Sequence, residues 1–508
     1  MRSRLLPSLS SRVLSLSTRS VWVTLLAPLT VLLSCSTTFD PAPCQRDADC
    51  GTALICAGHG EQRRCDRPEQ EPLRIGMSAP GSGPSIDLGV EMRRGVQLVF
   101  DAQNTQGGIR GRQLVLDFRD DEYEPALAEQ NARALLDVKP TGLPPRCPTT
   151  LTPPAGGAPV SQEALDRGPG AVLAVLGNVG TPTMVRFAPL SLETGTLFFG
   201  AFTGATALLR DDSAGDCKRY VFNVRASYGQ EAEATMEYFQ SLGIQDPASV
   251  LSFDQNDSFG DAGYTGLVAA YTKKVGALPT GTTLPRFRYD KGNPASVQQA
   301  IDATVAYLGG LLAQPGNRKV GVLMTDTYAP ALSFLQAVRT WQYADPDRAS
   351  RLAITFSNVS FVGPNSLATR LTAAGTIPNS NGVPFGQDVV ISQVVPNYQD
   401  DPGDIVTSYR QAIEAVGASP TFTSFEGYVA ARVFVAGLLA HQGEFTPEAL
   451  IATFEATPEV SLGLGASSGF SAASHNYSRT VWGTVLTAQG TFRNLYYWSE
   501  GTPIRFFE

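Results

Sequence analysis

The spacing of hydrophobic positions changes repeatedly between residues 72 and 137. Residues 73–77 have the pattern of a short strand, and residues 87–104 carry apolar side chains at helical spacing, namely Leu88, Met92, Val96 and Val99. Residues 113–118 alternate as a strand does, and a second helical pattern starts at Pro125. Strands that alternate with helices in this way predict a β-α-β-α unit with a parallel sheet and right-handed crossovers.

The same alternation continues through most of the chain. Further strands are expected at 171–177, 196–199, 220–224, 250–253, 284–289, 320–324, 354–356, 389–395, 481–486 and 492–498. Residues 139–169 are rich in proline, glycine and threonine, and they interrupt the pattern as a surface insertion. A chain of 508 residues is too long for one compact core. We therefore expect at least two domains of the α/β class.

The first 34 residues have the pattern of an export signal. Residues 1–33 contain four arginines and no acidic residue. Residues 21–33 form an apolar run that is shorter than a membrane span requires. The run ends in Leu32-Leu33-Ser34-Cys35, which resembles the lipobox of bacterial lipoproteins. Cys35 is therefore the expected lipidation site. An ordinary secretory signal cleaved nearby is the alternative.

The six cysteines after Cys35 fall into two groups. Cys44, Cys50, Cys56 and Cys65 lie in a segment that is poor in large apolar residues and needs two disulfides to hold a structure. Three connectivities are possible, and we favour Cys44–Cys56 with Cys50–Cys65. A zinc site that includes His59 is the alternative, but the segment has no C-x-x-C pair. Cys147 and Cys217 are expected to pair, tying the insertion to the loop after the fourth strand.

Charge and motifs exclude several classes of function. The net charge is −8, and removal of the leader would make it four units more negative, so nucleic acid is not an expected partner. The three histidines, His59, His441 and His475, stand in unrelated contexts. The sequence contains no G-x-S-x-G, no H-E-x-x-H and no Walker loop. We therefore expect neither an enzyme nor a metal or other cofactor.

A set of short motifs follows in order from the first strand. Ser82-Gly83-Pro84 forms a small-residue turn, Gly95 lies partway along the helix, Gly107-Gly108-Ile109-Arg110-Gly111-Arg112 ends it, and Asp120-Asp121 ends the second strand. In this order and spacing they resemble the start of the periplasmic leucine/isoleucine/valine-binding protein family, the solute receptors of ABC transporters. Residues 426–431 are similar to a late helix of that family, and the resemblance covers about residues 72–500.

The resemblance implies a type I periplasmic-binding-protein fold. This is an α/β fold of two Rossmann-like lobes joined by a hinge, here preceded by a small Cys-rich segment. The expected division is 1–34 for a lipoprotein signal peptide, 35–71 for the Cys-rich segment, 72–222 with 388–480 for the first lobe, and 223–387 with 481–508 for the second. The strand at 389–395 is expected to return the chain to the first lobe or the hinge.

The first-lobe site residues follow from the strand ends. In open parallel sheets, ligands bind beyond the carboxyl ends of the strands, where Ser82, Thr181 and Thr203 stand in this chain. Helices expected after Gly180 and Gly204 would point backbone N–H groups at an anion. The resemblance implies that Thr181 and Thr203 hold a ligand carboxylate, although both residues would also serve as helix caps. Leu88 stands where the family often has an aromatic residue.

The second-lobe residues depart from the family pattern. Phe259 replaces a tyrosine that precedes a glycine. Tyr328 or Thr327 stands at the position of another family tyrosine, with Asp326 beside it. The family's acidic partner for a ligand ammonium should follow the strand that ends at Phe356. Residues 357–360, which include Asn358, contain no acid there. Either Asp326 faces the cleft and an amine binds, or the ligand is uncharged or purely anionic.

The sequence thus predicts a lipid-anchored solute-binding protein of the periplasm. It would bind a small polar metabolite, an amino acid or related carboxylate, as a monomer and deliver it to an ABC permease. A ligand-sensing receptor lipoprotein on the same fold, without a transporter, is the alternative. The membrane contact would be the lipid anchor alone.

Overall fold

The computed structural model describes residues 42–46, 49–51, 54–57, 64–66, 71–147, 159–206, 216–456, 462, 464 and 469–507. The expected signal peptide, the lipidation site Cys35 and His59 lie outside the described residues.

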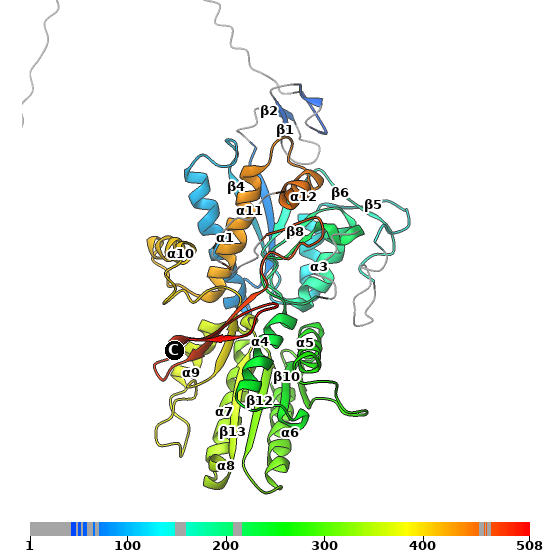
Figure 1. Ribbon diagram of the computed structural model, residues 1–508. Coiled ribbons are helices and arrows are strands. Elements are labelled where there is room, and N and C mark those ends of the chain that lie inside the picture. Colours follow the sequence, from blue (N-terminus) through cyan, green and yellow to red (C-terminus); the bar gives the residue numbers. More distant parts are fainter. Residues whose placement is uncertain are drawn as a thin grey trace, which may run out of the picture. The chain divides into compact units, whose positions relative to one another are not determined.

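A five-stranded parallel sheet forms the first lobe (Figure 1), in the order β4-β3-β7-β8-β9. Its strands are β3 (Leu73–Ala79), β4 (Leu114–Asp120), β7 (Ala174–Leu176), β8 (Leu197–Phe199) and β9 (Val221–Phe222). The helices α1 (Ile86–Thr105), α2 (Pro125–Leu135) and α3 (Thr181–Glu193) connect them. β7 is buried along its whole length, as the continuous apolar run at 171–177 predicts for a central strand.

An eight-stranded mixed sheet forms the second lobe, in the order β11-β10-β12-β13-β14-β15-β16-β17. Its parallel strands are β10 (Val250–Gln255), β11 (Arg286–Tyr289), β12 (Arg318–Thr325), β13 (Leu352–Asn358) and β14 (Val390–Gln393). The strands β15 (Thr480–Leu486), β16 (Phe492–Ser499) and β17 (Arg505–Phe506) are added antiparallel. The accompanying helices are α4 (Tyr228–Ser241), α5 (Ser258–Lys274), α6 (Pro294–Leu312), α7 (Tyr328–Tyr343), α8 (Pro346–Arg351) and α9 (Pro364–Ala373). The parallel strands repeat the order of the first lobe.

The strand at residues 390–393 corrects one expectation. It is not a strand of the first-lobe sheet but lies between β13 and β15, parallel to the former and antiparallel to the latter, and the chain crosses to the first lobe only after it. All four of its residues are buried, so a neighbour on each side is needed to satisfy its backbone hydrogen bonds. The lobe boundary expected at residue 388 is therefore wrong for this strand. The terminal hairpin β15–β16 joins the second sheet, as expected.

Three later helices, α10 (Asp404–Ala415), α11 (Phe422–Ala440) and α12 (Pro447–Ala456), follow β14. α11 packs closely on α1 of the first lobe (Figure 1). A Cβ atom on Gly95 would lie 1.9 Å from the carbonyl oxygen of Ser424, so only glycine permits this approach of the two backbones. α11 is long and apolar enough to cross a membrane, but 83% of its most apolar window is buried inside the protein. We therefore interpret α11 as a core helix.

The chain crosses between the lobes after β9, after β14 and before β15. The first and last crossings lie side by side, because Asn223 and Asn476 form a parallel bridge. The Asn223 N–H donates to the carbonyl of His475, and the Tyr477 N–H donates to the carbonyl of Asn223. The several crossings expected from the sequence are thus present, and two of them are hydrogen-bonded to each other.

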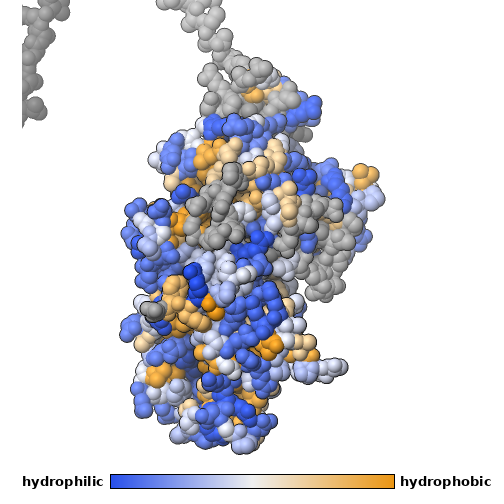
Figure 2. All heavy atoms as spheres, in the orientation of Figure 1, coloured by the Kyte–Doolittle hydropathy of each residue, from blue (hydrophilic) through white to orange (hydrophobic). Residues whose placement is uncertain are grey.

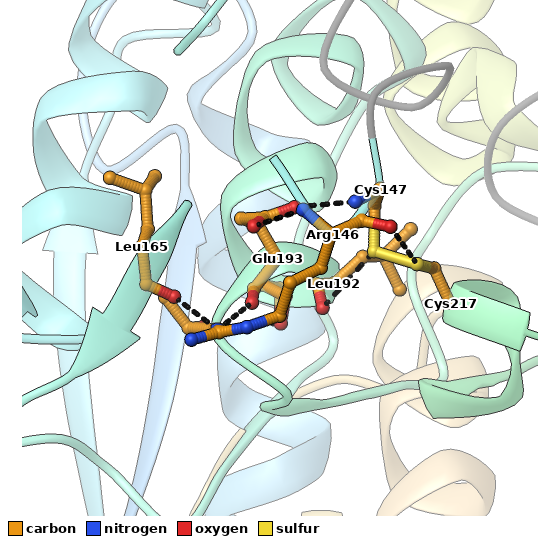
Figure 3. Close-up of a disulfide and its surroundings, with 8 residues drawn as sticks. Arg146, Cys147, Leu165, Leu192, Glu193 and Cys217 are labelled. Atoms are coloured by element: carbon orange, nitrogen blue, oxygen red, sulfur yellow. Dashed lines mark hydrogen bonds between the residues drawn. A yellow bond between two sulfur atoms is a disulfide. The ribbon is translucent and has the colours of Figure 1, made fainter. Parts of the chain in front are cut away.

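Three disulfides join the six described cysteines. Cys44 pairs with Cys56 and Cys50 with Cys65, the connectivity favoured from the sequence, around the small hairpin of β1 (Ile55–Ala57) and β2 (Arg64–Asp66). Cys147 pairs with Cys217, also as expected (Figure 3). Cys147 lies in the chain between β5 (Val138–Pro140) and β6 (Leu165–Arg167), which pair antiparallel. The sulfurs of the first group are all used in disulfides, which leaves no thiolate for zinc.

The face drawn in Figure 2 is mostly hydrophilic, with hydrophobic residues scattered singly or in small groups. Near the C-terminus, Phe506 and Phe507 are about half exposed. Scattered exposure of this kind is ordinary for a protein surface and needs no partner to explain it.

Candidate functional site

The carboxyl end of the first-lobe sheet brings together small polar residues from three strands. Ser78 is the second-last residue of β3, and its N–H donates to the side-chain oxygen of Asn178, which follows β7. The hydroxyls of Thr181 and Thr203 are 2.7 Å apart and hydrogen-bond to each other. Both threonines are almost fully buried, at 2% and 1% exposure. The structure thus brings two of the predicted site residues into direct contact.

The turn before Thr181 requires glycine. Gly180 has a φ of 98°, in the left-handed region, and caps the start of α3. A Cβ atom there would lie 2.2 Å from the ring of Tyr123. Thr181 is the first residue of α3, as the sequence predicts. The second expected helix does not begin after Gly204, because residues 204–206 are irregular and the Gly204 carbonyl instead accepts from the N–H of Tyr228.

A buried carboxyl lies behind this edge. Asp121 is inaccessible to solvent and accepts from the Ser78 hydroxyl at 2.7 Å and from the Tyr123 N–H at 2.9 Å. Burial raises the pKa of Asp121 to about 7, because the charged form is poorly solvated there, although the two hydrogen bonds act in the opposite direction. Ser82, by contrast, is only partly buried, and its hydroxyl donates to Asp120.

The carboxyl end of the second-lobe sheet holds the pair Asp326 and Asn358. The Asn358 amide donates to Asp326 at 2.6 Å, and both residues are fully buried. Among the described residues, the other oxygen of Asp326 and the side-chain oxygen of Asn358 have no hydrogen-bond partner. Burial raises the pKa of Asp326 well above its usual range, and the hydrogen bond from Asn358 only partly offsets this.

Aromatic rings from both lobes meet between the two sheet edges. Phe361 belongs to a 3-10 turn of the second lobe (Ser360–Val362), and its ring lies 4.8 Å from that of Phe202 and 6.1 Å from that of Tyr123 in the first lobe. Phe259 stands 4.9 Å from Phe361, and Tyr228 stands 5.4 Å from Phe259. We call Tyr123, Phe202, Tyr228, Phe259 and Phe361 the aromatic cluster.

A cavity of about 420 Å³ lies at the starts of α1, α9 and α11. Both lobes line it, because α1 and α11 belong to the first lobe and α9 to the second. Its lining residues are Asp87, Leu88, Glu91, Gly363, Asn365, Ser366, Thr369, Arg370, Thr421 and Thr423. The volume is within the range of small-molecule sites.

The cavity carries charges of both signs. Asp87 accepts from the Ser366 hydroxyl at 2.8 Å and lies 3.8 Å from the Arg370 guanidinium, so these contacts cross from one lobe to the other. Glu91 accepts from the Thr421 hydroxyl at 3.0 Å and pairs with Arg94. The side chains of Asp87 and Arg370 are 41% and 46% exposed, so both can still reach a solute.

Further contacts tie the lobes together around this region. The Tyr328 hydroxyl donates to the carbonyl of Pro84 in the first lobe. Lys291 of the second lobe donates to the carbonyl of Tyr123 and pairs with Glu124 at 2.9 Å. The two lobes are therefore in contact through Tyr328 and Lys291 as well as through the aromatic cluster.

The predicted site residues do not all meet. Leu88 lines the cavity, and Tyr328 approaches it, since both side chains lie within 3 Å of where a Cβ of Gly363 would be. Thr181 and Thr203 form one pair, Asp326 and Asn358 another, and Phe259 joins the aromatic cluster. Ser82 does not line the cavity, and its hydroxyl donates to Asp120.

Sequence reasoning missed most of the cavity. The resemblance predicts an acidic partner at 357–360, but none of these residues lines the cavity. Asn365, Ser366 and Arg370 of α9 line it instead. The Gly363-Pro364 step, which signals a helix start, could have indicated α9. Asp87 and Glu91 each stand one residue before a buried apolar position of α1, Leu88 and Met92 respectively, and have no signal of their own.

No described group of residues forms a metal site. The one set of potential ligands that is close enough, Cys44, Cys50 and Cys65, is disulfide-bonded. Two histidines have structural contacts: His441 hydrogen-bonds Thr453 and the carbonyl of Glu444, and His475 stacks on Phe222 at 3.9 Å.

Comparison with known proteins links this architecture to one family. A family model described as periplasmic binding protein matches residues 72–142 and 152–491. A curated relative, Leu/Ile/Val-binding protein homolog 3 of Brucella melitensis, is 38% identical over 53 residues. That stretch spans 10% of this chain and 14% of the relative.

Solved structures match over most of the chain. A possible leucine/isoleucine/valine-binding protein from Rhodopirellula baltica is 29% identical, with a TM-score of 0.65 over 85% of this chain and 98% of that one. A branched-chain amino acid ABC transporter protein from Thermus thermophilus with bound valine is 14% identical, with a TM-score of 0.59 over 86% of this chain and 97% of that one. A solute-binding protein from R. palustris in complex with benzoate is 17% identical, with a TM-score of 0.57 over 86% of this chain and 98% of that one. The last two show a shared fold.

Proposed function

Because the chain belongs to the periplasmic binding protein family, we propose that it is a lipid-anchored receptor that captures a small polar metabolite for an ABC transporter. The observation that carries the proposal is the cavity lined by both lobes. A solute there would contact α1 and α9 at once and so stabilise the arrangement in which the lobes meet. That coupling is how a two-lobed receptor reports occupancy to a partner.

The charges of the cavity favour an amino acid or a related carboxylate as the solute. Arg370 offers a planar, bidentate donor for a carboxylate, whereas Asp87 and Glu91 offer acceptors for an ammonium group. Thr369, Thr421 and Thr423 supply hydroxyls around them. Valine and benzoate, named for two structural neighbours, are both carboxylates, which supports the same class.

A bulky side chain at the rim of the cavity should weaken solute binding. We expect a panel of L-amino acids and small carboxylates to contain at least one solute that raises the melting temperature, because a ligand of the folded state stabilises it. Thr369→Trp should then weaken that solute at least tenfold in calorimetric titration, about 1.4 kcal/mol, since the exposed Thr369 side chain lies on the rim of the cavity.

Ala373→Trp is the matched control. It places the same bulky side chain one turn further along α9, at an exposed position outside the cavity lining, and should leave binding unchanged. Equal affinity of Thr369→Trp and wild type for the same solute would contradict the cavity as the binding site. Failure of every solute in the panel to bind would count against the receptor function for this class.

The lipid anchor is part of the proposal and is tested separately. Cys35→Ala should release the protein from membranes without lowering its melting temperature, because the acyl chains would lie outside the folded lobes. The measurement is partitioning into detergent, with Ser36→Ala as the neighbouring control. If Cys35→Ala partitions as wild type does, lipidation at this residue is wrong.

A further inference from the structure

The walls of the cavity are built almost entirely from side chains that carry a polar group. Leu88 is the only aliphatic residue among those that line it, and its side chain is fully buried. The Leu88 Cδ2 atom lies 2.9 Å from where a Cβ of Gly363 would be, so the side chain packs against the backbone at the start of α9. An aliphatic solute side chain in the cavity would therefore cover polar groups without replacing their hydrogen bonds to water, which costs free energy.

Thr423 brings an unused hydroxyl to this lining. It is the second residue of α11, it is 5% exposed, and it lines the cavity. Within the part of the chain that the structure describes, no residue forms a hydrogen bond with its hydroxyl. The neighbouring Thr421 hydroxyl, by contrast, donates to Glu91 at 3.0 Å and accepts from the Ser424 N–H as the cap of α11. Because a buried hydroxyl is costly to leave unpaired, Thr423 is suited to a polar solute group.

Asn365 adds an amide of fixed orientation close to Thr423. Its side-chain N–H donates to the Tyr398 hydroxyl at 2.6 Å. Its side-chain oxygen accepts at 3.0 Å from the N–H of Phe422, the residue before Thr423. An amide has two N–H groups and two lone pairs on its oxygen, so both ends keep capacity for a solute. A group that donates and accepts, such as a hydroxyl or a carboxamide, matches this pair of side chains.

The charges of the cavity leave no place for a third charge on the solute. Glu91 pairs with Arg94, and Asp87 lies 3.8 Å from Arg370, which is held over the Tyr328 ring at 4.7 Å. The two carboxylates thus balance the two guanidiniums, and a zwitterion adds no net charge. A further charge on the solute side chain would find no free opposite charge in this set.

We infer, on the basis of the proposed function, that the receptor selects an amino acid with an uncharged polar side chain, a hydroxyl or a carboxamide. It discriminates against branched aliphatic amino acids, and Thr423 is a specificity-determining residue for this choice. A site that hydrogen-bonds a solute hydroxyl rejects the analogue without it strongly, because the polar groups of the site are then left unpaired.

Pairs of amino acids with nearly equal shape test the inference by calorimetric titration of the wild-type protein. L-Threonine and L-valine differ by a hydroxyl in place of a methyl group, and L-asparagine and L-leucine differ by a carboxamide in place of an isopropyl group. We expect the polar member to bind roughly tenfold or more tightly than its aliphatic partner in at least one pair. A smaller preference in both pairs would overturn the inference, and so would a failure of all four amino acids to bind.

Thr423→Val then removes the hydroxyl while keeping the shape of the side chain. It should lower the preference by roughly fivefold or more, through weaker binding of the polar amino acid. Thr423→Ser, which keeps the hydroxyl, should retain the preference. Thr272→Val makes the same exchange at an exposed position of α5 outside the cavity lining and should change nothing.

An undiminished preference in Thr423→Val would overturn the role of Thr423, whereas the wild-type titrations do not depend on how well any variant folds. The receptor function is tested separately through Thr369→Trp. A solute that Thr369→Trp weakens, but that shows no preference for a polar side chain, would leave the receptor function standing and overturn only the choice of solute.

Discussion

Replacing Arg225 by methionine is expected to lower the free energy of unfolding by about 3–5 kcal/mol, the usual cost of removing one partner from a buried ion pair. Arg225 lies in the first crossing between the lobes and is 2% exposed. Its guanidinium binds Glu231 on α4 and Glu426 on α11, and it also donates to the Ser360 hydroxyl. Without it, two carboxylates would remain in a poorly solvated site.

The remaining contacts explain why little of this loss could be recovered. Glu231 is fully buried and also accepts from the Ser360 N–H at 2.7 Å and from the Ser392 hydroxyl. Because these donors hold the carboxylate in place, it cannot turn toward water. The network joins the crossing after β9 to β14 and to the 3-10 turn that carries Phe361, so the variant should also loosen the contact between the lobes.

Chemical denaturation measures the effect, and an exposed ion pair provides the control. Lys273 pairs with Glu233 at 2.8 Å, but the lysine side chain is 53% exposed. Lys273→Met should therefore cost less than about 1 kcal/mol. If Arg225→Met costs no more than Lys273→Met, the buried network does not stabilise the crossing as described.

Removal of the Cys147–Cys217 disulfide should have the second-largest effect. The bridge links residues 70 positions apart, and the loop-closure model assigns such a bridge roughly 4 kcal/mol through the entropy of the unfolded chain. The double variant Cys147→Ala with Cys217→Ala is expected to lose up to this amount, measured by denaturation without reductant.

Hydrogen bonds around Cys147 should keep the loss of unfolding free energy below this upper value. The N–H groups of Arg146 and Cys147 donate to the two carboxylate oxygens of Glu193, the last residue of α3, at 2.8 Å each (Figure 3). The Arg146 guanidinium also donates to the carbonyls of Leu165 and Glu193. These bonds do not need the disulfide, so part of the native placement should survive its loss.

The N-terminal cysteines supply the comparison. Cys44–Cys56 spans only 12 positions, and its sulfurs form a small cluster separate from the main core. Its removal should lower the free energy of unfolding of the lobes less than removal of Cys147–Cys217 does. A larger effect from the N-terminal bridge would show that the long loop is not the stabilising element.

The sequence by itself determined the local structure and much of the cysteine pairing. The spacing of apolar positions predicts α1 at 87–104, and the helix spans Ile86–Thr105. Composition separated four clustered cysteines from two isolated ones, and the structure pairs them within those groups. Such inferences succeed because they depend on neighbours along the chain, where periodicity and residue type report directly on burial.

The tertiary structure alone decided which residues meet between the lobes. Asp87 and Ser366 are 279 positions apart, and nothing in either local pattern indicates their hydrogen bond. Phe361 has the sequence context of an ordinary core residue, yet it crosses from one lobe to the rings of the other. Strand 390–393 has the pattern of any buried strand, and only its pairing assigns it to the second sheet. A periodic pattern shows that a side chain is buried, but which surface buries it depends on how distant elements are placed.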